Sequence, residues 1–276
     1  MSEHKGLLHK MSTQLLSPVA YQLTLGAETL TLNDSLGKKI KLNFSGNIVC
    51  QHCQRKIKKS YNQGYCFPCF KKLAQCDMCI MKPETCHYDR GTCREPVWAE
   101  KHCMQNHTVY LANSSGLKVG ITRNTQVPTR WIDQGAIQAL PLFEVKNRLH
   151  SGLVEVLIAE YVADKTNWRA MLKGEVSELD MLAQRDIIIN QCEEQLEYLY
   201  EEVEDFHLEP LSDEEVVNIN YPVLEYPKKI ISHNVEKTPE IEGILLGIKG
   251  QYLIFDTGVI NIRKHSAYEV NISLEA

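Results

Sequence analysis

The stretch HTVYLANSSGLKVGITR, residues 107–123, decides the fold of this chain. Two apolar runs flank Asn-Ser-Ser-Gly, which has the composition of a turn, so the stretch predicts a β-hairpin. The second strand contains Gly120 and is bracketed by Lys118 and Arg123. A glycine inside a strand marks a bulge or a place where another backbone comes close. We therefore expect this hairpin to carry function as well as structure.

Periodic segments surround the hairpin on both sides. YQLTL, ETLTL and KIKLNF, within residues 18–49, alternate apolar with polar residues and predict strands. EGILLGIKGQYLIFDTGVINIR, residues 242–263, predicts a three-stranded meander with turns at Lys249-Gly250 and Asp256-Thr257-Gly258. This C-terminal part has the features of a small oligonucleotide-binding barrel. The aromatic side chains that could stack on bases there are Tyr252, Phe255 and Tyr268.

Three helices are expected after the hairpin. VPTRWIDQG, residues 127–135, predicts a short helix with Pro128 in its first turn and Gly135 as its stop. Residues 151–165 predict a second helix with a buried stripe of Leu153, Val154, Leu157, Ile158, Tyr161 and Val162. Residues 178–205 predict a long acidic helix with an apolar face of Leu179, Leu182, Ile189, Leu196 and Leu199.

These patterns predict an α+β chain: a small mixed sheet with helices, preceded by a zinc-ribbon-like cysteine-rich segment and flanked by small β domains. The expected organisation is an N-terminal β segment (1–49), a cysteine-rich segment (50–107), an α/β domain (108–175), an acidic helical segment (176–218) and a C-terminal β domain (219–276).

The composition predicts a soluble, cytoplasmic protein. The chain has 276 residues and is 43% hydrophobic, which is enough for a substantial core. No apolar run approaches the length of a membrane span, so no membrane partner is expected. The beginning, MSEHKGLLHKM, lacks the basic-then-apolar form of a signal peptide.

Nine of the ten cysteines lie between Cys50 and Cys103. In a reducing compartment such a cluster indicates metal binding rather than disulfides. Two Cys-x-x-Cys pairs, each of which presents two thiolates to one ion, predict a structural zinc site. Its ligands are Cys50, Cys53, Cys66 and Cys69. Free or redox-active thiols are the alternative, and they explain one such pair better than two.

A second zinc site is possible in the following stretch, CDMCIMKPETCHYDRGTCREPVWAEKHCMQNH. One choice of ligands is Cys79, Cys86, Cys93 and Cys103, and Cys76 or His107 could replace one of them. Closed sites of this kind stabilise a segment that lacks a core and perform no chemistry. The tenth cysteine, Cys192, lies in the acidic helix and is expected to be ordinary packing.

The net charge of −5 does not by itself indicate a nucleic-acid-binding protein, but the charges are unevenly distributed. Residues 35–76 contain no acid and nine basic residues. Within them, the candidates for contact with a nucleic-acid backbone are Arg55, Lys56, Lys58 and Lys59. A solvated lysine face is the alternative. Residues 175–225 are strongly acidic, and their helix is a candidate surface for a protein partner.

The hairpin and the residues after it resemble the GIY-YIG nuclease superfamily over about residues 108–170. Thr108-Val109-Tyr110 stands for its first motif and Lys118-Val119-Gly120 for its second, in the variant with lysine in place of tyrosine. Arg130 and Glu155 fall where the superfamily has a helical arginine and a helical glutamate. The whole chain also resembles an uncharacterised bacterial family, domain of unknown function 2797, on CIMKPETCH, GTCREPVW, KVGITR and RWIDQGA.

The superfamily resemblance implies a metal-dependent hydrolase of nucleic-acid phosphodiesters. Glu155 would hold Mg²⁺ or Mn²⁺, Arg130 would neutralise charge on the phosphate, and Tyr110 would position or deprotonate the attacking water. Lys118 would replace part of the missing tyrosine or bind the backbone. Gly120 would let the nucleic-acid backbone approach the strand, and Arg123 would contact a phosphate.

Two other functions fit the same residues. The first is a zinc-containing nucleic-acid-binding protein that keeps the fold without the chemistry, because patterns assign folds better than activities. The second is a protein-interaction scaffold that uses the acidic helix. Tyr110 could be a core tyrosine, and Arg130 and Glu155 could be a surface pair of little energetic value.

Overall fold

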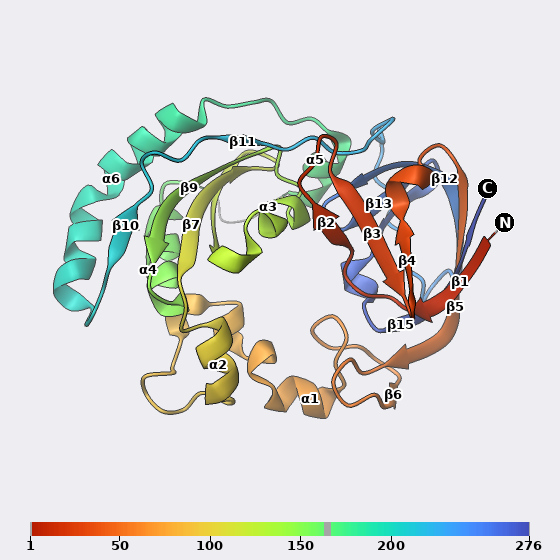
Figure 1. Ribbon diagram of the computed structural model, residues 1–276, viewed down its shortest axis with the longest axis horizontal. Helices are drawn as coiled ribbons and strands as arrows, with labels where there is room; N and C mark the ends of the chain where they lie inside the picture. The colour runs from red at the N-terminus through yellow and green to blue at the C-terminus, as the bar shows by residue number, and fades with distance from the viewer. Residues whose placement is uncertain (1, 163–166, 276) are drawn as a thin grey trace.

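The computed structural model describes residues 2–162 and 167–275. It is a mixed α+β structure with several antiparallel sheets. Three parts are arranged as a ring (Figure 1). They are a β unit made from both ends of the chain (residues 2–49 and 240–275), a hairpin unit (residues 107–218) and the cysteine-rich segment that joins them.

The main sheet of the β unit pairs strands from opposite ends of the chain. Its order is β1-β15-β5-β12-β13-β14, with β6 on β5, and every pair is antiparallel. The strands are β1 Ser2–Leu7, β5 Lys39–Val49, β6 Lys56–Ile57, β12 Glu240–Lys249, β13 Tyr252–Phe255, β14 Gly258–Asn261 and β15 Tyr268–Leu274. The predicted meander is confirmed, but the sequence did not predict that β5 lies between β12 and β15.

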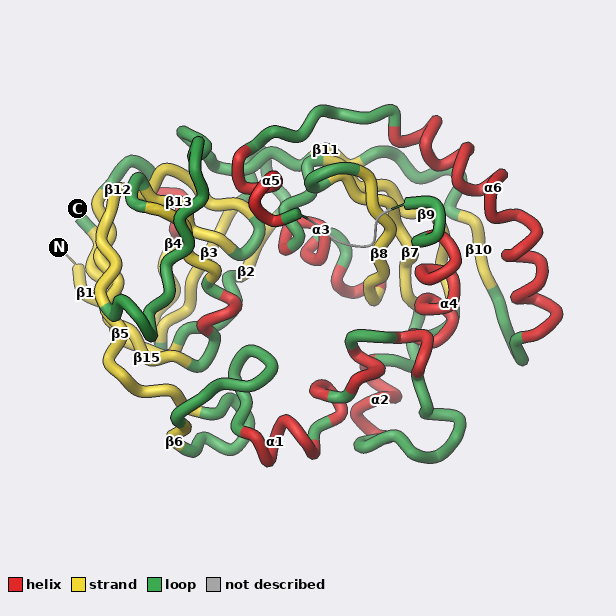
Figure 2. The backbone as a smooth tube through the Cα atoms, turned by 180° about the vertical axis from the view of Figure 1, so that it is seen from behind, coloured by secondary structure: helices red, strands yellow, loops and turns green. Residues whose placement is uncertain are grey.

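A smaller sheet, β2-β3-β4, completes the β unit, and the two termini lie beside each other (Figures 1 and 2). Its strands are β2 Ser12–Gln14, β3 Ala20–Leu25 and β4 Glu28–Thr31. Phe255 and Tyr268 are buried, and Tyr252 stacks on Trp168 of α5 (Trp168–Lys173). The three aromatic residues that were expected to stack on bases therefore form no open platform, because the fold uses them for packing.

The hairpin unit contains the sheet that the opening stretch predicted. Its order is β10-β9-β7-β8, with β11 also on β9, so β8 is an edge strand. The strands are β7 His107–Asn113, β8 Leu117–Arg123, β9 Gln138–Val145, β10 Leu208–Pro210 and β11 Val217–Asn218. Alternation along the hairpin divides its side chains between the two faces of the sheet.

Each face of this sheet is buried in a different core. Val109 and Val119 share a cluster with residues of α4 (Arg148–Ile158) and α6 (Met181–Glu202). Tyr110, on the other face, belongs with Trp131 of α3 (Thr129–Asp133) to the large core of the β unit. The hairpin unit and the β unit therefore share one continuous core.

The helices differ in detail from the expectations. The short helix α3 is confirmed, and Gly135 follows it with a φ of 69°. The second helix starts earlier than predicted, because the Asn147 side chain caps it at the His150 amide, and it ends at Ile158. Tyr161 and Val162 are partly buried beyond its end, and the predicted residues 163–165 lie outside the described residues.

Most of the apolar face predicted for the acidic helix packs as expected: Leu196 is buried, and Leu179, Ile189 and Leu199 are partly buried against the same core. Leu182, expected on the apolar face, is 43% exposed. Cys192 is buried as expected. The residues that α6 buries are Met181, Ile188, Cys192 and Leu196.

The cysteine-rich segment has two short helices, α1 Phe67–Lys72 and α2 Pro96–His102, joined by turns. It packs against α4 at Gly152. A Cβ atom on Gly152 would lie 2.4 Å from the Glu84 nitrogen and 2.6 Å from the Pro83 carbonyl carbon, both of them backbone atoms. This close approach fixes the segment to the hairpin unit.

We predict that Gly152→Ala destabilises the protein although alanine is the better helix former by about 1 kcal/mol. The overlap with backbone should lower the free energy of unfolding by about 1–3 kcal/mol, as measured by urea denaturation. Val156→Ala, at a position of the same helix that is 47% exposed, is the control and should change stability little. A Gly152→Ala protein as stable as the wild type would show that the contact is not tight.

Candidate functional site

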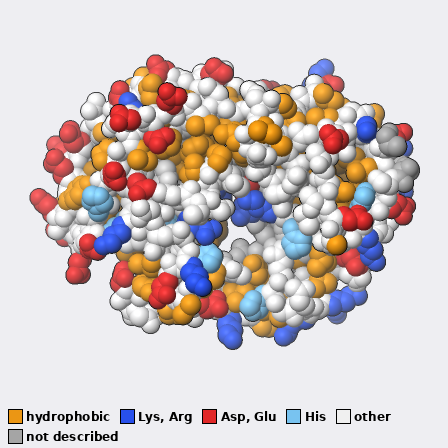
Figure 3. All heavy atoms as spheres, in the orientation of Figure 1, with side chains coloured by type: hydrophobic (Ala, Val, Ile, Leu, Met, Phe, Trp, Pro, Cys, Tyr) orange, Lys and Arg blue, Asp and Glu red, His pale blue; other side chains and the backbone are white. Residues whose placement is uncertain are grey.

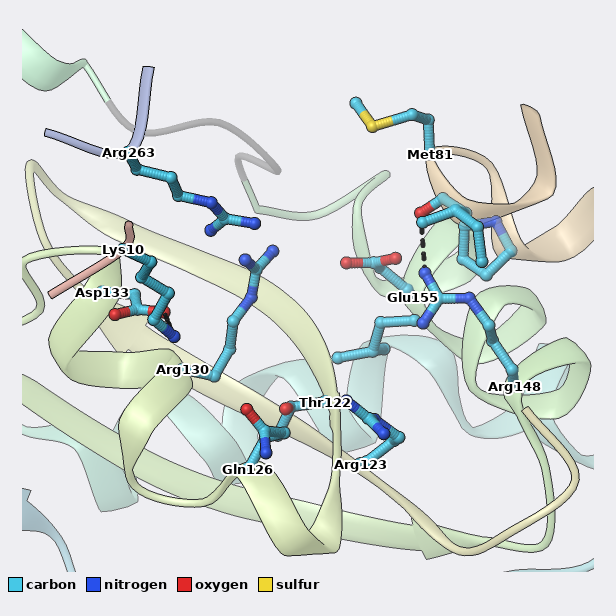
Figure 4. Close-up of a pocket in the computed structure, with 13 residues that line it drawn as sticks. Lys10, Met81, Thr122, Arg123, Gln126, Arg130, Asp133, Arg148, Glu155 and Arg263 are labelled. Atoms are coloured by element: carbon cyan, nitrogen blue, oxygen red, sulfur yellow. Dashed lines mark hydrogen bonds and ion pairs between the residues drawn. The ribbon is translucent and has the colours of Figure 1, made fainter. Parts of the chain in front are cut away.

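A cavity of about 380 Å³ lies along the edge strand β8, between α3 and α4. Figure 4 shows side chains from all three parts of the molecule pointing into it. The hairpin unit supplies Arg123, Arg130 and Glu155, which the sequence predicted to act together. The β unit adds Lys10 and Arg263, and the cysteine-rich segment adds the wall. The residues of that wall are Ile80, Met81 and Pro83.

Positive charge dominates this cavity, which we call the anion pocket. Its ionisable residues comprise five cations and two carboxylates. They are Lys10, Arg123, Arg130, Arg148 and Arg263, with Asp133 and Glu155. Clustered guanidinium groups match the geometry of phosphate oxygens. The sequence did not predict three of these cations, Lys10, Arg148 and Arg263. Only Arg148 could have been found from the sequence, because it lies two helical turns before Glu155 on the same helix, α4.

The two carboxylates of the anion pocket come from different helices, Asp133 from α3 and Glu155 from α4. The Asp133 carboxylate forms an ion pair with the Lys10 ammonium and accepts a hydrogen bond of 2.9 Å from the Gln251 amide. Glu155 projects from α4 toward the middle of the pocket (Figure 4). A carboxylate there is an oxygen donor of the kind that Mg²⁺ and Mn²⁺ prefer.

Two arginines are held in the pocket at an energetic cost. Burial lowers the pKa of Arg263, and the positive charge of Arg130 lowers it further. Their guanidinium groups point toward each other in Figure 4. Arg263 is fixed by a hydrogen bond of 2.8 Å from its Nε to the Gln63 side-chain oxygen. Two like charges brought together in this way favour an anion between them.

Arg148 joins the anion pocket to the cysteine-rich segment. Burial lowers its pKa, and its Nη2 donates a 2.7 Å hydrogen bond to the Ile80 carbonyl. Its Nε is buried and has no hydrogen-bond partner among the described residues. A buried donor of this kind costs free energy unless a ligand or water accepts from it.

Tyr110 lies behind the anion pocket and does not line it. Its side chain is fully buried, its hydroxyl donates to the Gln134 side-chain oxygen at 3.1 Å, and burial raises its pKa to about 12. The positive charge of Arg130 acts against this rise in pKa, so the arginine lies near the Tyr110 hydroxyl. A buried phenol with a raised pKa is a poor base for a water molecule.

Gly120 pairs with Tyr110 across the hairpin. A Cβ atom at Gly120 would lie 2.7 Å from the Tyr110 hydroxyl and 2.8 Å from its Cζ. Gly120 is buried, so packing against Tyr110 accounts for the glycine, and the approach of a nucleic-acid backbone to this strand stays a prediction. The glycine is needed because the tyrosine side chain occupies the space above it.

Lys118 is also buried, with 4% of its surface exposed, and lies on the hairpin away from the anion pocket. Arg55, Lys56, Lys58 and Lys59 are exposed in the cysteine-rich segment, outside the pocket. Arg55 donates through Nε to the Cys53 sulfur at 3.1 Å. Contact between these exposed cations and nucleic acid stays a prediction.

The four cysteines of the predicted zinc site lie together. The sulfur atoms of Cys50, Cys53, Cys66 and Cys69 are all within 4.8 Å of one another, and those of Cys53 and Cys66 are 3.7 Å apart. Four sulfurs at about 2.3 Å from one zinc ion would be separated by roughly 3.8 Å. The cluster therefore fits one tetrahedral zinc ion.

The environment of these thiols also suits a cation. A hydrogen bond from the Arg55 backbone lowers the pKa of Cys53 to about 6, whereas burial raises that of Cys69 to about 12. Without a cation the cluster cannot hold four thiolates, but a divalent ion would stabilise all four.

The four cysteines of the possible second site line one apolar cavity of about 10 Å³. They are Cys79, Cys86, Cys93 and Cys103. Among the described residues of this region, the closest ligand group is instead Asp77, Cys79 and His87, whose donor atoms lie within 4.8 Å of one another. Cys76 packs with the first cluster, and His107 is buried with its pKa lowered to about 4 by burial. A second ion stays a prediction.

We predict that Gly120→Ala lowers the free energy of unfolding by about 1–3 kcal/mol because its methyl group overlaps the Tyr110 ring. Tyr110→Leu removes that ring. In a double-mutant cycle the two losses should therefore sum to more than the loss of the double variant. Additive losses would show that the two residues do not constrain each other.

We predict that the purified protein binds one zinc ion at the first cluster, and that Cys69→Ser abolishes this ion and lowers the melting temperature. Metal content by mass spectrometry and thermal unfolding measure both effects. Cys192→Ser removes a buried cysteine of α6 and should leave the zinc content unchanged. Equal zinc content in the two variants would contradict the assignment.

The comparisons with known proteins give one match. The model of a family described as a protein of unknown function (DUF2797) matches residues 37–270. Neither the curated proteins nor the solved structures contain a significant match to the chain. Among the described residues, no helix has the length and apolar character needed to cross a membrane.

Proposed function

The chain belongs to the DUF2797 family of proteins of unknown function, and we propose that it is a metal-dependent nuclease that hydrolyses a phosphodiester bond in the anion pocket. One observation carries this proposal. Arg130 and Glu155, which come from different helices, line the same cavity beside the edge strand of the hairpin. Their order along the chain, after a hairpin, is that of the GIY-YIG superfamily.

The chemistry of the pocket supports phosphodiester binding. Arg123, Arg130 and Arg263 present guanidinium groups to one space, and each can donate two parallel hydrogen bonds to phosphate oxygens. Electrostatic stabilisation of the transition state is the main contribution that a protein makes to phosphoryl transfer. We assign this role to Arg130, which lines the cavity with Glu155 and lies near the buried Tyr110 hydroxyl.

Glu155 is the residue that would hold Mg²⁺ or Mn²⁺. Magnesium commonly uses one or two carboxylates together with water and phosphate oxygens, so a single glutamate is sufficient. When bound, such an ion acts as a Lewis acid on the phosphate.

The two hairpin residues act indirectly in this proposal. In this proposal Tyr110 positions Arg130, and Lys118 is a structural residue buried in strand β8 of the hairpin. Zinc at Cys50, Cys53, Cys66 and Cys69 would be structural, since four thiolates leave no open coordination position. It would hold the segment that forms one wall of the anion pocket.

We predict that the protein with Mg²⁺ or Mn²⁺ cleaves nucleic acid, and that Glu155→Gln and Arg130→Ala each reduce the rate by about 10²–10³-fold. Glu160→Gln and Arg90→Ala make the same changes at exposed positions outside the pocket and should retain activity. The assay follows labelled single-stranded, duplex and branched DNA and structured RNA on denaturing gels. Cleavage that survives Glu155→Gln would come from a contaminant or another site.

A nucleic-acid-binding protein without catalysis is the second candidate. It is favoured by the burial of Tyr110 and Lys118, which leaves fewer reactive groups in the pocket. Binding that depends on Arg130, without cleavage in any metal, would support it. A protein partner on α6 also stays a proposal, with Ile187 and Tyr198 about half exposed on that acidic helix.

A further inference from the structure

The anion pocket continues into a second cavity of about 430 Å³. The two cavities share four lining residues, Lys10, Ile80, Met81 and Arg263, and are therefore adjacent. Figure 3, in the orientation of Figure 1, shows a hollow near the centre of the molecule with Lys and Arg side chains at its edge. The second cavity runs from Arg263 toward the loops of the cysteine-rich segment, and we call the two together the passage.

The second cavity has a lining unlike that of the anion pocket. Among the described residues that line it there is no carboxylate, and most of its polar groups are uncharged. They include Gln51, Asn62, Gln63, Tyr65 and Gln75. Side-chain amides and a phenol can both donate and accept hydrogen bonds, as base edges and sugars require.

Hydrogen bonds hold these groups in place. The side-chain amide of Gln75 donates to the Tyr65 hydroxyl at 2.9 Å, and the side-chain amide of Asn62 donates to the backbone carbonyl of Gln75 at 3.3 Å. The Gln63 oxygen accepts from Arg263 at 2.8 Å, which joins the amide lining to the cationic pocket. Polar groups that are already oriented lose little entropy when a ligand binds.

The size of the passage limits what can occupy it. Both volumes are in the range of small-molecule pockets, about 300–1,000 Å³. Walls from the β unit, the hairpin unit and the cysteine-rich segment surround it. Met81, which is 75% exposed, stands where the cavities meet and offers an apolar contact to a base. Such a space suits single nucleotides in series.

We propose that the substrate is a single-stranded nucleic acid that lies along the passage, with one phosphate at Arg130 and Glu155 and the neighbouring nucleotide among the amides beyond Arg263. This inference rests on the proposed function for the identity of the anion. Single-strand binding combines a cationic track with groups that contact the bases, and both are present here. A duplex would need an open groove.

The test is fluorescence anisotropy with a labelled single-stranded oligonucleotide and the duplex of the same sequence, both DNA and RNA, without divalent metal. We expect the single strand to bind at least tenfold more tightly than the duplex. Gln63→Glu should weaken single-strand binding by about tenfold, because the new carboxylate keeps the acceptor for Arg263 but neutralises its charge. Gln22→Glu, the same change at an exposed position of β3, should have no effect.

Equal or tighter duplex binding, or equal effects of the two substitutions, would contradict the proposal that a single strand lies along the passage. A cleavage assay on the same proteins distinguishes failure of this inference from failure of the proposed nuclease function. Single-strand binding that is sensitive to Gln63→Glu, without cleavage in any metal, would leave the passage standing and remove the nuclease. Duplex cleavage that depends on Glu155 would do the reverse.

Discussion

The candidate site depends on the convergence of cations from three distant parts of the chain in one cavity. Lys10, Arg148 and Arg263 come from the N-terminal part, the hairpin unit and the C-terminal part, and they line the same cavity as Glu155. Burial opposes the charge of both Arg148 and Arg263. Desolvated like charges destabilise a fold unless fixed acceptors and an anion offset them. Arg148 binds a backbone carbonyl of the cysteine-rich segment, and Arg263 binds Gln63 of the same segment. A bound phosphate would supply the remaining compensation.

The cysteine-rich segment therefore connects metal binding to the candidate site. The buried cluster of this segment consists of Leu73 and four cysteines, Cys50, Cys66, Cys69 and Cys76. This is too little apolar surface for the segment to fold alone. The cysteine sulfurs lie at a spacing that suits zinc, and Gly152 lets the segment contact α4 through backbone. We expect a zinc ion at this cluster to fix the segment that carries Ile80, whose carbonyl accepts the hydrogen bond from Arg148 at the anion pocket.

Much of the fold could be predicted from local sequence, whereas the pairing of Arg130 with Glu155 was implied only by the resemblance to the GIY-YIG superfamily. The hairpin, the meander and α3 follow from periodicity and turn residues, and the first cysteine cluster follows from ligand spacing. Lys10 and Arg263 could not be predicted, because their approach depends on pairing between strands from opposite ends of the chain. The packing reason for Gly120 could not be predicted for a similar reason: its cross-strand neighbour, Tyr110, determines which residue fits there. Leu182 shows that a helical stripe is set by the partner surface as well as by the period.

The most direct test of the account is the salt dependence of oligonucleotide binding by the wild type and by Arg130→Gln. Each phosphate that a cation contacts on a single strand contributes about −0.7 to the slope of log K against log salt. We expect a clear negative slope for the wild type, and a slope reduced by about one phosphate contact for Arg130→Gln. Equal slopes in the two proteins, or binding that does not depend on salt, would contradict the claim that this pocket recognises the phosphate backbone.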